Sequence, residues 1–177
     1  MIERNTYENF YIDFLKTEIW PFVDKFMILT NQVSSDNEYF FAGNGASAAI
    51  ASHLANDFSK TLNVRGNTFH DPAVITCLAN DYGYDMWIAE AIKIHSKKND
   101  NLILISSSGR SKNIINAAKI AKSIGLKIIV LCGPRPSNDL IETADLHLKV
   151  KNNSYNVIEC CHMMTLCAVV DSKNYLE

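Results

Sequence analysis

The sequence predicts an α/β protein in which helices cover both faces of a central parallel sheet. Runs such as NLILI and LKIIVLC are hydrophobic at every position, as expected of strands covered on both faces. Such runs alternate with helical patterns from residue 101 to residue 172. The chain has 177 residues, with neither internal repeats nor low-complexity tracts. We therefore expect a single three-layer domain over residues 1–177.

The first segment predicts a long amphipathic helix ahead of the core. Apolar residues recur at helical spacing through residues 5–33, and many of them are aromatic. Pro21 lies inside this pattern and is expected to bend the helix. The domain is thus divided into an N-terminal helix, 1–35, and an α/β core, 36–177.

The core elements follow in order along the chain. YFFAG (39–43) predicts a short strand, and residues 46–62 predict a helix. Residues 72–81 fit either a strand or a short helix. The further expected elements are a helix at 84–98, a strand at 101–106, a helix at 110–124, a strand at 126–132, a helix at 137–144, a strand at 145–150 and a helix at 155–172.

The composition is that of an ordinary globular protein, with 47% hydrophobic residues, 20% charged residues and a net charge of -2. This balance gives no reason to expect nucleic acid or a membrane as partner, but it is compatible with a small anionic ligand. No apolar run approaches the roughly 18 residues of a membrane span, and the N-terminus lacks the apolar core of a signal peptide. The five cysteines are expected as reduced thiols, which makes the cytoplasm the expected compartment.

Two loops carry small polar residues where a strand ends and a helix begins. They are GNGAS at 43–47 and SSSGRS at 106–111. In an open parallel sheet ligands bind at the carboxyl ends of the strands, and helix N-termini favour anions. The sequence therefore predicts a cradle for a phosphate or sugar, formed by the Gly109 backbone and by the hydroxyls of Ser106, Ser107, Ser108 and Ser111.

Three other interpretations explain these loops less well. Helix capping by Ser108 or Ser111 accounts for one hydroxyl, not four. A nucleophilic serine would need the pattern GxSxG, which neither loop has. GNGASA fits a loose dinucleotide fingerprint, but the acidic residue expected about 20 positions later is missing, and Arg65 and Gly66 stand there instead.

Titratable residues form a second cluster on two expected helices. His53 and Asp57 share one helix face at i, i+4. Glu159 and His162 share a face at i, i+3, and Cys167 follows eight residues after Glu159, close to the same side. Each pair alone reads as a solvated surface pair. Together they indicate a site able to exchange protons or to bind a metal.

Three segments carry a family resemblance: FAGNGASAAIASHLANDF, LANDYGYD and LILISSSGRSKNIINAAKIAKSIGLKIIVLCG. They resemble the sugar isomerase (SIS) fold and, more narrowly, are similar to the phosphoheptose isomerases over nearly the whole chain. The resemblance implies interconversion of sedoheptulose 7-phosphate and an aldoheptose 7-phosphate through an enediol. It also implies a homotetramer or homodimer with sites between subunits, and often zinc as a cofactor.

The resemblance assigns roles to individual residues. It implies that the serine loop holds the phosphate and that the other substrate contacts come from Asn44, Gly45, Ala46, Ser47, Asn80, Asp81 and Glu159. His53 matches the family's pattern. Asp57 stands where the family has a glutamate that serves as base and zinc ligand, Glu159 stands for a glutamine, and Cys167 stands for the histidine acid.

These departures fall on the groups that would transfer protons. Asp57 is the expected base, and Cys167 and His162 are the candidates for the missing acid. His53, Asp57, Glu159 and Cys167 are the candidate ligands of a zinc ion, for which a thiolate is a strong ligand. Two alternatives stand beside the heptose enzyme. One is an SIS-fold protein that binds a sugar phosphate or a protein such as a replication initiator without catalysis, and the other is an isomerase of another phosphosugar such as a hexulose phosphate.

Overall fold

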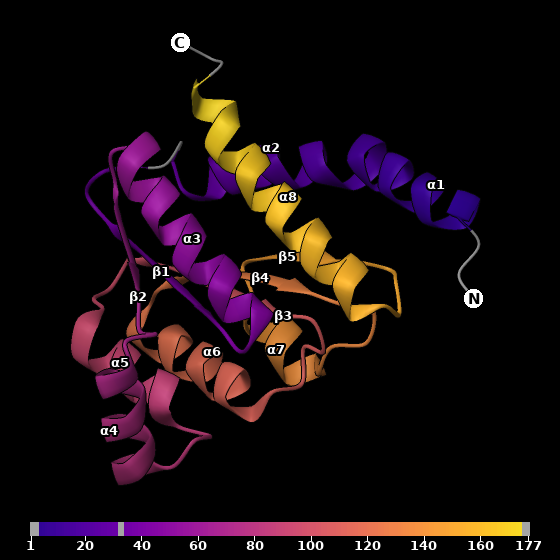
Figure 1. The fold of residues 1–177 in the computed structure, drawn as a ribbon. Coiled ribbons are helices and arrows are strands. Elements are labelled where there is room, and N and C mark those ends of the chain that lie inside the picture. Colours follow the sequence, from indigo (N-terminus) through magenta and orange to yellow (C-terminus); the bar gives the residue numbers. More distant parts are fainter. Residues whose placement is uncertain (1–3, 32–33, 175–177) are drawn as a thin grey trace.

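The computed structural model describes residues 4–31 and 34–174 (Figure 1). The parts of the expected N-terminal helix at 1–3 and 32–33, and the last residues of the expected domain at 175–177, lie outside the described residues. Within the described part, five parallel strands form one sheet in the order β2-β1-β3-β4-β5. The strands are β1 (Glu38–Gly43), β2 (Arg65–Thr68), β3 (Asn101–Ser106), β4 (Lys127–Cys132) and β5 (Leu146–Lys149).

Helices cover both faces of this sheet (Figure 1). One face packs against α2 (Trp20–Leu29), α3 (Ala46–Thr61) and α8 (Tyr155–Asn174). The other face packs against α4 (Pro72–Tyr82), α5 (Trp87–His95), α6 (Lys112–Ile124) and α7 (Asn138–Thr143). Every residue of β3 is buried, as its uniformly apolar sequence predicts for a strand covered on both faces. The expected three-layer α/β architecture is confirmed.

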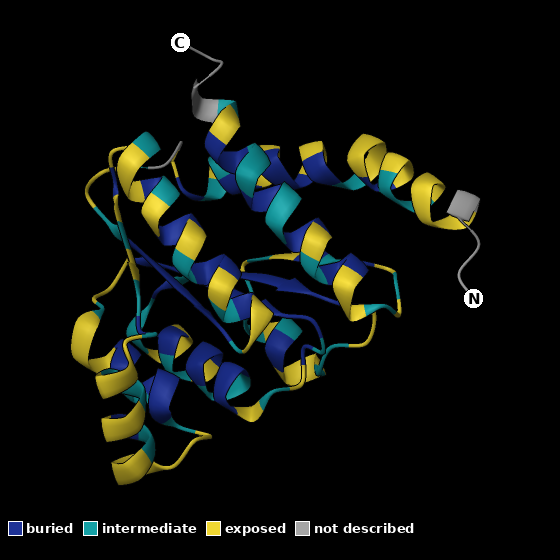
Figure 2. Cartoon of the chain, viewed as in Figure 1, coloured by how far each residue is buried: buried dark blue, intermediate teal, exposed yellow. Residues whose placement is uncertain are grey.

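The N-terminal helix is interrupted before Pro21. It consists of α1 (Arg4–Phe14), a π-helical segment η1 (Leu15–Ile19) and α2. Pro21 has no backbone N–H, so the carbonyl of Thr17 loses its usual partner and the winding changes in the preceding turn. Figure 2 shows that α1 extends past the sheet and is largely exposed. Within the described residues, no helix is long and apolar enough to cross a membrane.

The structure settles one open prediction, the helix α4, and adds one strand that the sequence did not predict, β2. Residues 72–82 form a helix, because Asp71 caps its start: its Oδ1 accepts hydrogen bonds from the N–H groups of Ala73 at 2.8 Å and Val74 at 3.4 Å. Strand β2 was not predicted, because its four residues RGNT include no large apolar side chain. It pairs with β1 alone, at the edge of the sheet.

The strand order in the sheet reverses between β1 and β3: β2 lies on one side of β1, and β3, β4 and β5 follow on the other side. Strands β1 and β3 pair in parallel, with Gly43 opposite Ile105. The helix after β1 covers one face of the sheet, and the helix after β3 covers the other. A crevice therefore opens between the two strand ends, where open α/β sheets bind their ligands. Both small-residue loops lie at this point.

Candidate active site

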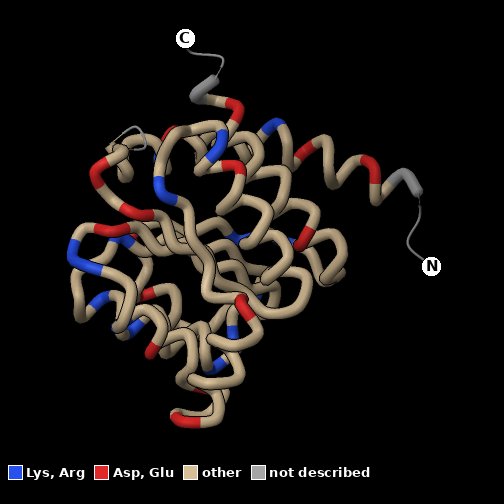
Figure 3. Tube along the Cα trace, turned by 60° about the vertical axis from the view of Figure 1, so that its left-hand side comes forward, with Lys and Arg blue, Asp and Glu red and all other residues tan. Residues whose placement is uncertain are grey.

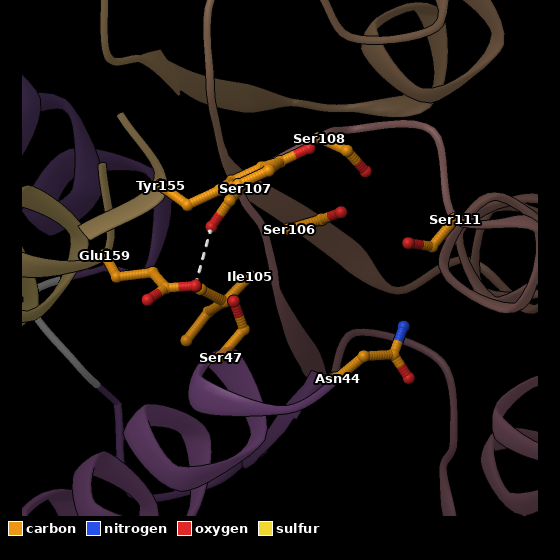
Figure 4. Close-up of a pocket in the computed structure, with 9 residues that line it drawn as sticks. All are labelled: Asn44, Ser47, Ile105, Ser106, Ser107, Ser108, Ser111, Tyr155 and Glu159. Carbon is orange, nitrogen blue, oxygen red and sulfur yellow. Dashed lines mark hydrogen bonds between the residues drawn. The ribbon is translucent and has the colours of Figure 1, made fainter. Parts of the chain in front are cut away.

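A pocket of about 260 Å³ lies between the ends of β1 and β3 (Figure 4). Its lining joins residues from both predicted loops and from the start of α8: Asn44, Ser47, Ile105, Ser106, Ser107, Ser108, Ser111, Tyr155 and Glu159. All four serines of the predicted cradle are present. In Figure 4 the side chains of Ser106, Ser108 and Ser111 surround the same open space.

The serine loop is held in shape by a glycine. Gly109 has a positive φ of 61°, and a Cβ on it would lie 2.5 Å from Cβ of Pro136. The Gly109 N–H donates to the carbonyl and to Oγ of Ser106, at 3.0 and 3.2 Å. The Arg110 N–H donates to Oγ of Ser108 at 3.1 Å. The loop thus turns tightly and keeps the serines on its inner side.

Ser111 lies at the N-cap position of α6 but makes no side-chain capping bond. Its hydroxyl is therefore free for a ligand, and capping does not explain this serine. The pocket lies at the N-termini of three helices, because its lining includes Ser47 near the start of α3, Ser111 at the start of α6 and Tyr155 at the start of α8. The partial positive charges of these helix ends favour an anion here.

Asn44 is held in place by groups that the sequence did not reveal. Its side-chain amide exchanges two hydrogen bonds with that of Asn113, at 2.9 and 3.0 Å, and its Oδ1 also accepts from the Tyr84 hydroxyl at 3.1 Å. Behind this loop the ring of His70 contacts Gly43, and burial lowers the pKa of the imidazole. His70 is therefore a neutral support for the loop near pH 7.

Glu159 and Tyr155 extend from the start of α8 toward the serine loop. The Ser107 hydroxyl donates to Oε1 of Glu159 at 3.4 Å. Glu159 was expected in this pocket, whereas Tyr155 was not. The signal for Tyr155 was its position: it opens the helix after β5, at the same edge of the sheet as the serine loop. Asn113, two residues after Ser111, had a similar signal.

Asn80 and Asp81 do not reach the pocket. Both lie on the exposed side of α4, where the Asn80 side-chain amide donates to Oδ1 of Asp81 at 2.9 Å. Leu78 is the buried residue of this helix, and the helical twist turns its polar neighbours outward. The substrate contact predicted for Asn80 and Asp81 stays a prediction. From this segment, the Tyr84 hydroxyl donates to Asn44, which lines the pocket.

Of the predicted cluster of titratable residues, His53 and Asp57 are in contact. Nε2 of His53 lies 3.1 Å from Oδ2 of Asp57, with side chains 53% and 31% exposed. Cys167 is half-buried on α8, which packs against α3. Burial raises the pKa of its thiol, and the negative charges of Asp57 and Asp171 raise it further. The thiol therefore stays protonated near pH 7.

The four expected zinc ligands do not come together as a set. Their donor types suit zinc, but Glu159 is turned toward Ser107. In the part of the chain that the structure describes, no three His, Cys, Asp or Glu side chains form a group that could hold a metal ion. Zinc as a cofactor stays a prediction.

His162 does not stand where an acid is needed. Its side chain is fully buried, and neither ring nitrogen has a hydrogen-bond partner in the described structure. Burial lowers the pKa of this imidazole to about 4, and the Cys132 backbone acts in the opposite direction. A neutral ring out of reach of any substrate does not transfer a proton to it. The expectation of a catalytic acid at this position is not met.

Comparisons with known proteins place the chain in one family. A model of the SIS domain matches residues 13–133. The chain is 32% identical over 155 residues to the phosphoheptose isomerase of Aliarcobacter butzleri, which covers 82% of each chain. It is 33% identical over 155 residues to a probable phosphoheptose isomerase of Thermoplasma acidophilum, covering 82% of this chain and 84% of that protein. The solved structure of phosphoheptose isomerase GmhA from Neisseria gonorrhoeae matches 97% of this chain and 94% of its own, with a TM-score of 0.86 and 25% identity.

Proposed function

Because the chain belongs to the SIS domain family, we propose that it is a phosphosugar isomerase that interconverts sedoheptulose 7-phosphate and an aldoheptose 7-phosphate. The observation that carries this proposal is the pocket between β1 and β3, which gathers serine hydroxyls at the starts of three helices. The sequence similarity to phosphoheptose isomerases favours a seven-carbon substrate over a hexulose phosphate.

The phosphate is held by neutral donors. Ser108 and Ser111 supply hydroxyls, and the first turn of α6 supplies N–H groups and the positive end of its dipole. The pocket lining contains neither lysine nor arginine, so hydrogen bonds and helix dipoles carry the recognition. Glu159 and Ser47 lie at the other end of the pocket in Figure 4 and would accept and donate hydrogen bonds to sugar hydroxyls.

Asp57 is the base in this proposal, and a second copy of the chain brings it to the substrate. Asp57 follows ten residues after Ser47 on α3, which places the two about 15 Å apart along the helix axis. This separation is too long for one sugar to be held at Ser47 and deprotonated by Asp57 of the same subunit. The His53–Asp57 pair is partly exposed, so it is free to face the pocket of a neighbouring subunit.

The N-terminal helix supports such an assembly. Among its described residues, five large apolar side chains are exposed: Tyr7, Ile12, Leu15, Trp20 and Ile28. Because α1 extends past the sheet, this surface lacks cover from its own core (Figure 2). We infer a homo-oligomer, a dimer or tetramer, in which α1 packs against another subunit.

The chemistry is a proton transfer between adjacent carbons. Asp57 removes a proton from C1 of the ketose, the C2 carbonyl oxygen gains a proton, and an enediol forms. Loss of the O1 proton and return of a proton to C2 then give the aldose. His53 holds the Asp57 carboxylate in position. Cys167 keeps its proton near pH 7 and is the candidate donor to the substrate oxygen, although a thiol is a weak acid.

A second function is favoured by one observation, the absence of a histidine acid from this cluster. Cys167 stands in the expected place, and His162 is buried. A chain with a complete cradle and no acid would bind a phosphosugar without converting it. Incubation of the purified protein with sedoheptulose 7-phosphate, with and without zinc, separates the two functions. Aldose formation supports the enzyme, and binding without turnover supports a sugar-phosphate-binding protein.

A further inference from the structure

A second pocket, of about 200 Å³, adjoins the phosphate cradle. It shares Ser107, Ser108 and Tyr155 with the first pocket. Its other lining residues are Arg110, Pro134, Arg135, Asn152, Asn153 and Ile158. We propose that this pocket binds a second phosphate group, beside the one held by the serine loop. The proposal goes beyond the isomerase function, because it concerns binding and not turnover.

The charge of the second pocket differs from that of the first. Two guanidinium groups line it, and no carboxylate does. Neither Arg110 nor Arg135 forms an ion pair with a carboxylate of the described residues. Since a guanidinium presents several N–H donors in a planar fork, two of them in one hollow are suited to a phosphate dianion. The first pocket, by contrast, contains the carboxylate of Glu159.

The side chain of Arg110, which lines the second pocket, is anchored by a hydrogen bond. Its Nε donates to the carbonyl of Arg135 at 2.8 Å. This bond fixes the side chain against the loop after β4 and leaves the terminal N–H groups of the guanidinium for a ligand. A side chain that is already fixed loses less conformational entropy when it binds.

The two loops that carry the arginines are joined to each other. The Gly133 N–H donates to the carbonyl of Ser107 at 3.1 Å, and the Ser137 N–H donates to the carbonyl of Gly109 at 2.9 Å. Gly109 packs closely against Pro136. The arginines therefore project from one connected platform at the ends of β3 and β4, the edge where this fold binds ligands.

Asn152 and Tyr155 complete the surroundings of the arginines. Oδ1 of Asn152 accepts the Ser154 N–H at 2.8 Å, and its amide nitrogen remains as a donor for a ligand. The Tyr155 side chain extends along the rim of the first pocket toward Ser108 (Figure 4). Like Ser107 and Ser108, it lines both pockets.

The test uses ligands that cannot isomerise because they lack a carbonyl: glucitol 6-phosphate, glucitol 1,6-bisphosphate and inorganic phosphate. Binding of each is measured by calorimetry to the unaltered protein and to the double variant R110Q/R135Q. The variant R65Q is the matched control, because Arg65 is an exposed arginine on the edge strand β2, with Glu38 as its partner. Thermal unfolding confirms that all variants are folded.

Two results support the proposal and identify the source of the phosphate. If one ligand spans both pockets, the bisphosphate binds about tenfold more tightly than the monophosphate, and R110Q/R135Q removes this gain. If the second phosphate belongs to a separate molecule, inorganic phosphate binds to protein saturated with glucitol 6-phosphate, and R110Q/R135Q abolishes that binding. In both cases R65Q behaves as the unaltered protein.

The proposal is overturned if R110Q/R135Q binds all three ligands within twofold of the unaltered protein. If the serine loop does not hold a phosphate, the measured affinities differ in another way. In that case the variant S111A binds glucitol 6-phosphate as tightly as the unaltered protein, whatever the arginine variant does.

Discussion

The hydroxyl of Ser107 donates a hydrogen bond to Oε1 of Glu159 at 3.4 Å, and this contact joins the serine loop to the start of α8 (Figure 4). It places a carboxylate in the same pocket as the proposed phosphate site. The Glu159 carboxylate and a bound phosphate would repel each other across the pocket, so the sugar chain would lie between them. In the proposed function, this carboxylate lies at the end of the pocket away from the phosphate.

The variant Glu159→Gln tests this arrangement. It removes the negative charge but keeps an oxygen that accepts from Ser107. Because the repulsion is lost, we expect glucitol 6-phosphate to bind roughly fivefold more tightly in calorimetry. The matched variant Glu142→Gln, on α7 outside the pocket, should leave the affinity unchanged. Weaker binding by E159Q would show instead that the carboxylate makes a hydrogen bond that the sugar needs.

The serine hydroxyls are tested by Ser108→Ala and Ser111→Ala. Each removes one donor to the phosphate, and we expect each to weaken binding of glucitol 6-phosphate by roughly 1 to 3 kcal/mol. Ser123→Ala is the control, because Ser123 lies at the other end of α6 and donates to the Ile120 carbonyl. Unchanged affinity in both pocket variants would mean that the serine loop does not hold the phosphate.

Most of the fold could be predicted from the sequence, because its buried strands are apolar at every position. The alternation of strand and helix between 101 and 172 indicated the parallel sheet. Strand β2 was missed because its RGNT sequence has no apolar signal, and its strand conformation depends on pairing with β1. Residues 72–81 stayed ambiguous until the capping bonds of Asp71 were seen.

The cradle could be predicted because its serines and glycine are contiguous in the sequence. Residues that depend on tertiary packing could not: Tyr84 reaches Asn44 across 40 positions of the chain. His162 shows the opposite error. Its i, i+3 spacing from Glu159 suggested a shared exposed face, but α8 packs against β4, α2 and α3, and His162 is fully buried.

The buried His162 predicts a pH dependence of stability. Because its pKa is lowered to about 4 in the folded protein, the folded state holds the neutral ring, whereas the unfolded chain gains a proton below about pH 6.5. Stability is therefore lost as the pH falls. Between pH 7 and pH 5 this group alone costs about 2 kcal/mol.

The comparison of the unaltered protein with His162→Leu isolates this effect. Urea unfolding at pH 7 and pH 5 should show a smaller loss of unfolding free energy in the variant. Isomerase activity at pH 7 should persist in H162L, because the side chain lies away from the substrate. An equal pH dependence in both proteins would contradict the assigned burial effect.

A subunit-mixing experiment tests whether Asp57 acts on the pocket of another copy. Asp57→Asn lacks the base, and the double variant S108A/S111A lacks the cradle, so each alone should be inactive. After the two are unfolded together and refolded as mixed oligomers, some sites should combine an intact cradle with an intact Asp57. We expect part of the activity to return. No recovery, with mixed oligomers present by mass spectrometry, would place both groups in one subunit.

The most direct test of the central claim is proton exchange in D2O, followed by NMR. The account predicts that the unaltered protein forms the aldoheptose 7-phosphate from sedoheptulose 7-phosphate and places solvent deuterium on the carbon beside the carbonyl, since an enediol exchanges its proton with water. D57N should bind the sugar but should neither form the aldose nor incorporate deuterium. Tight binding of the sugar by the unaltered protein, with no deuterium incorporation and no aldose, would contradict the account.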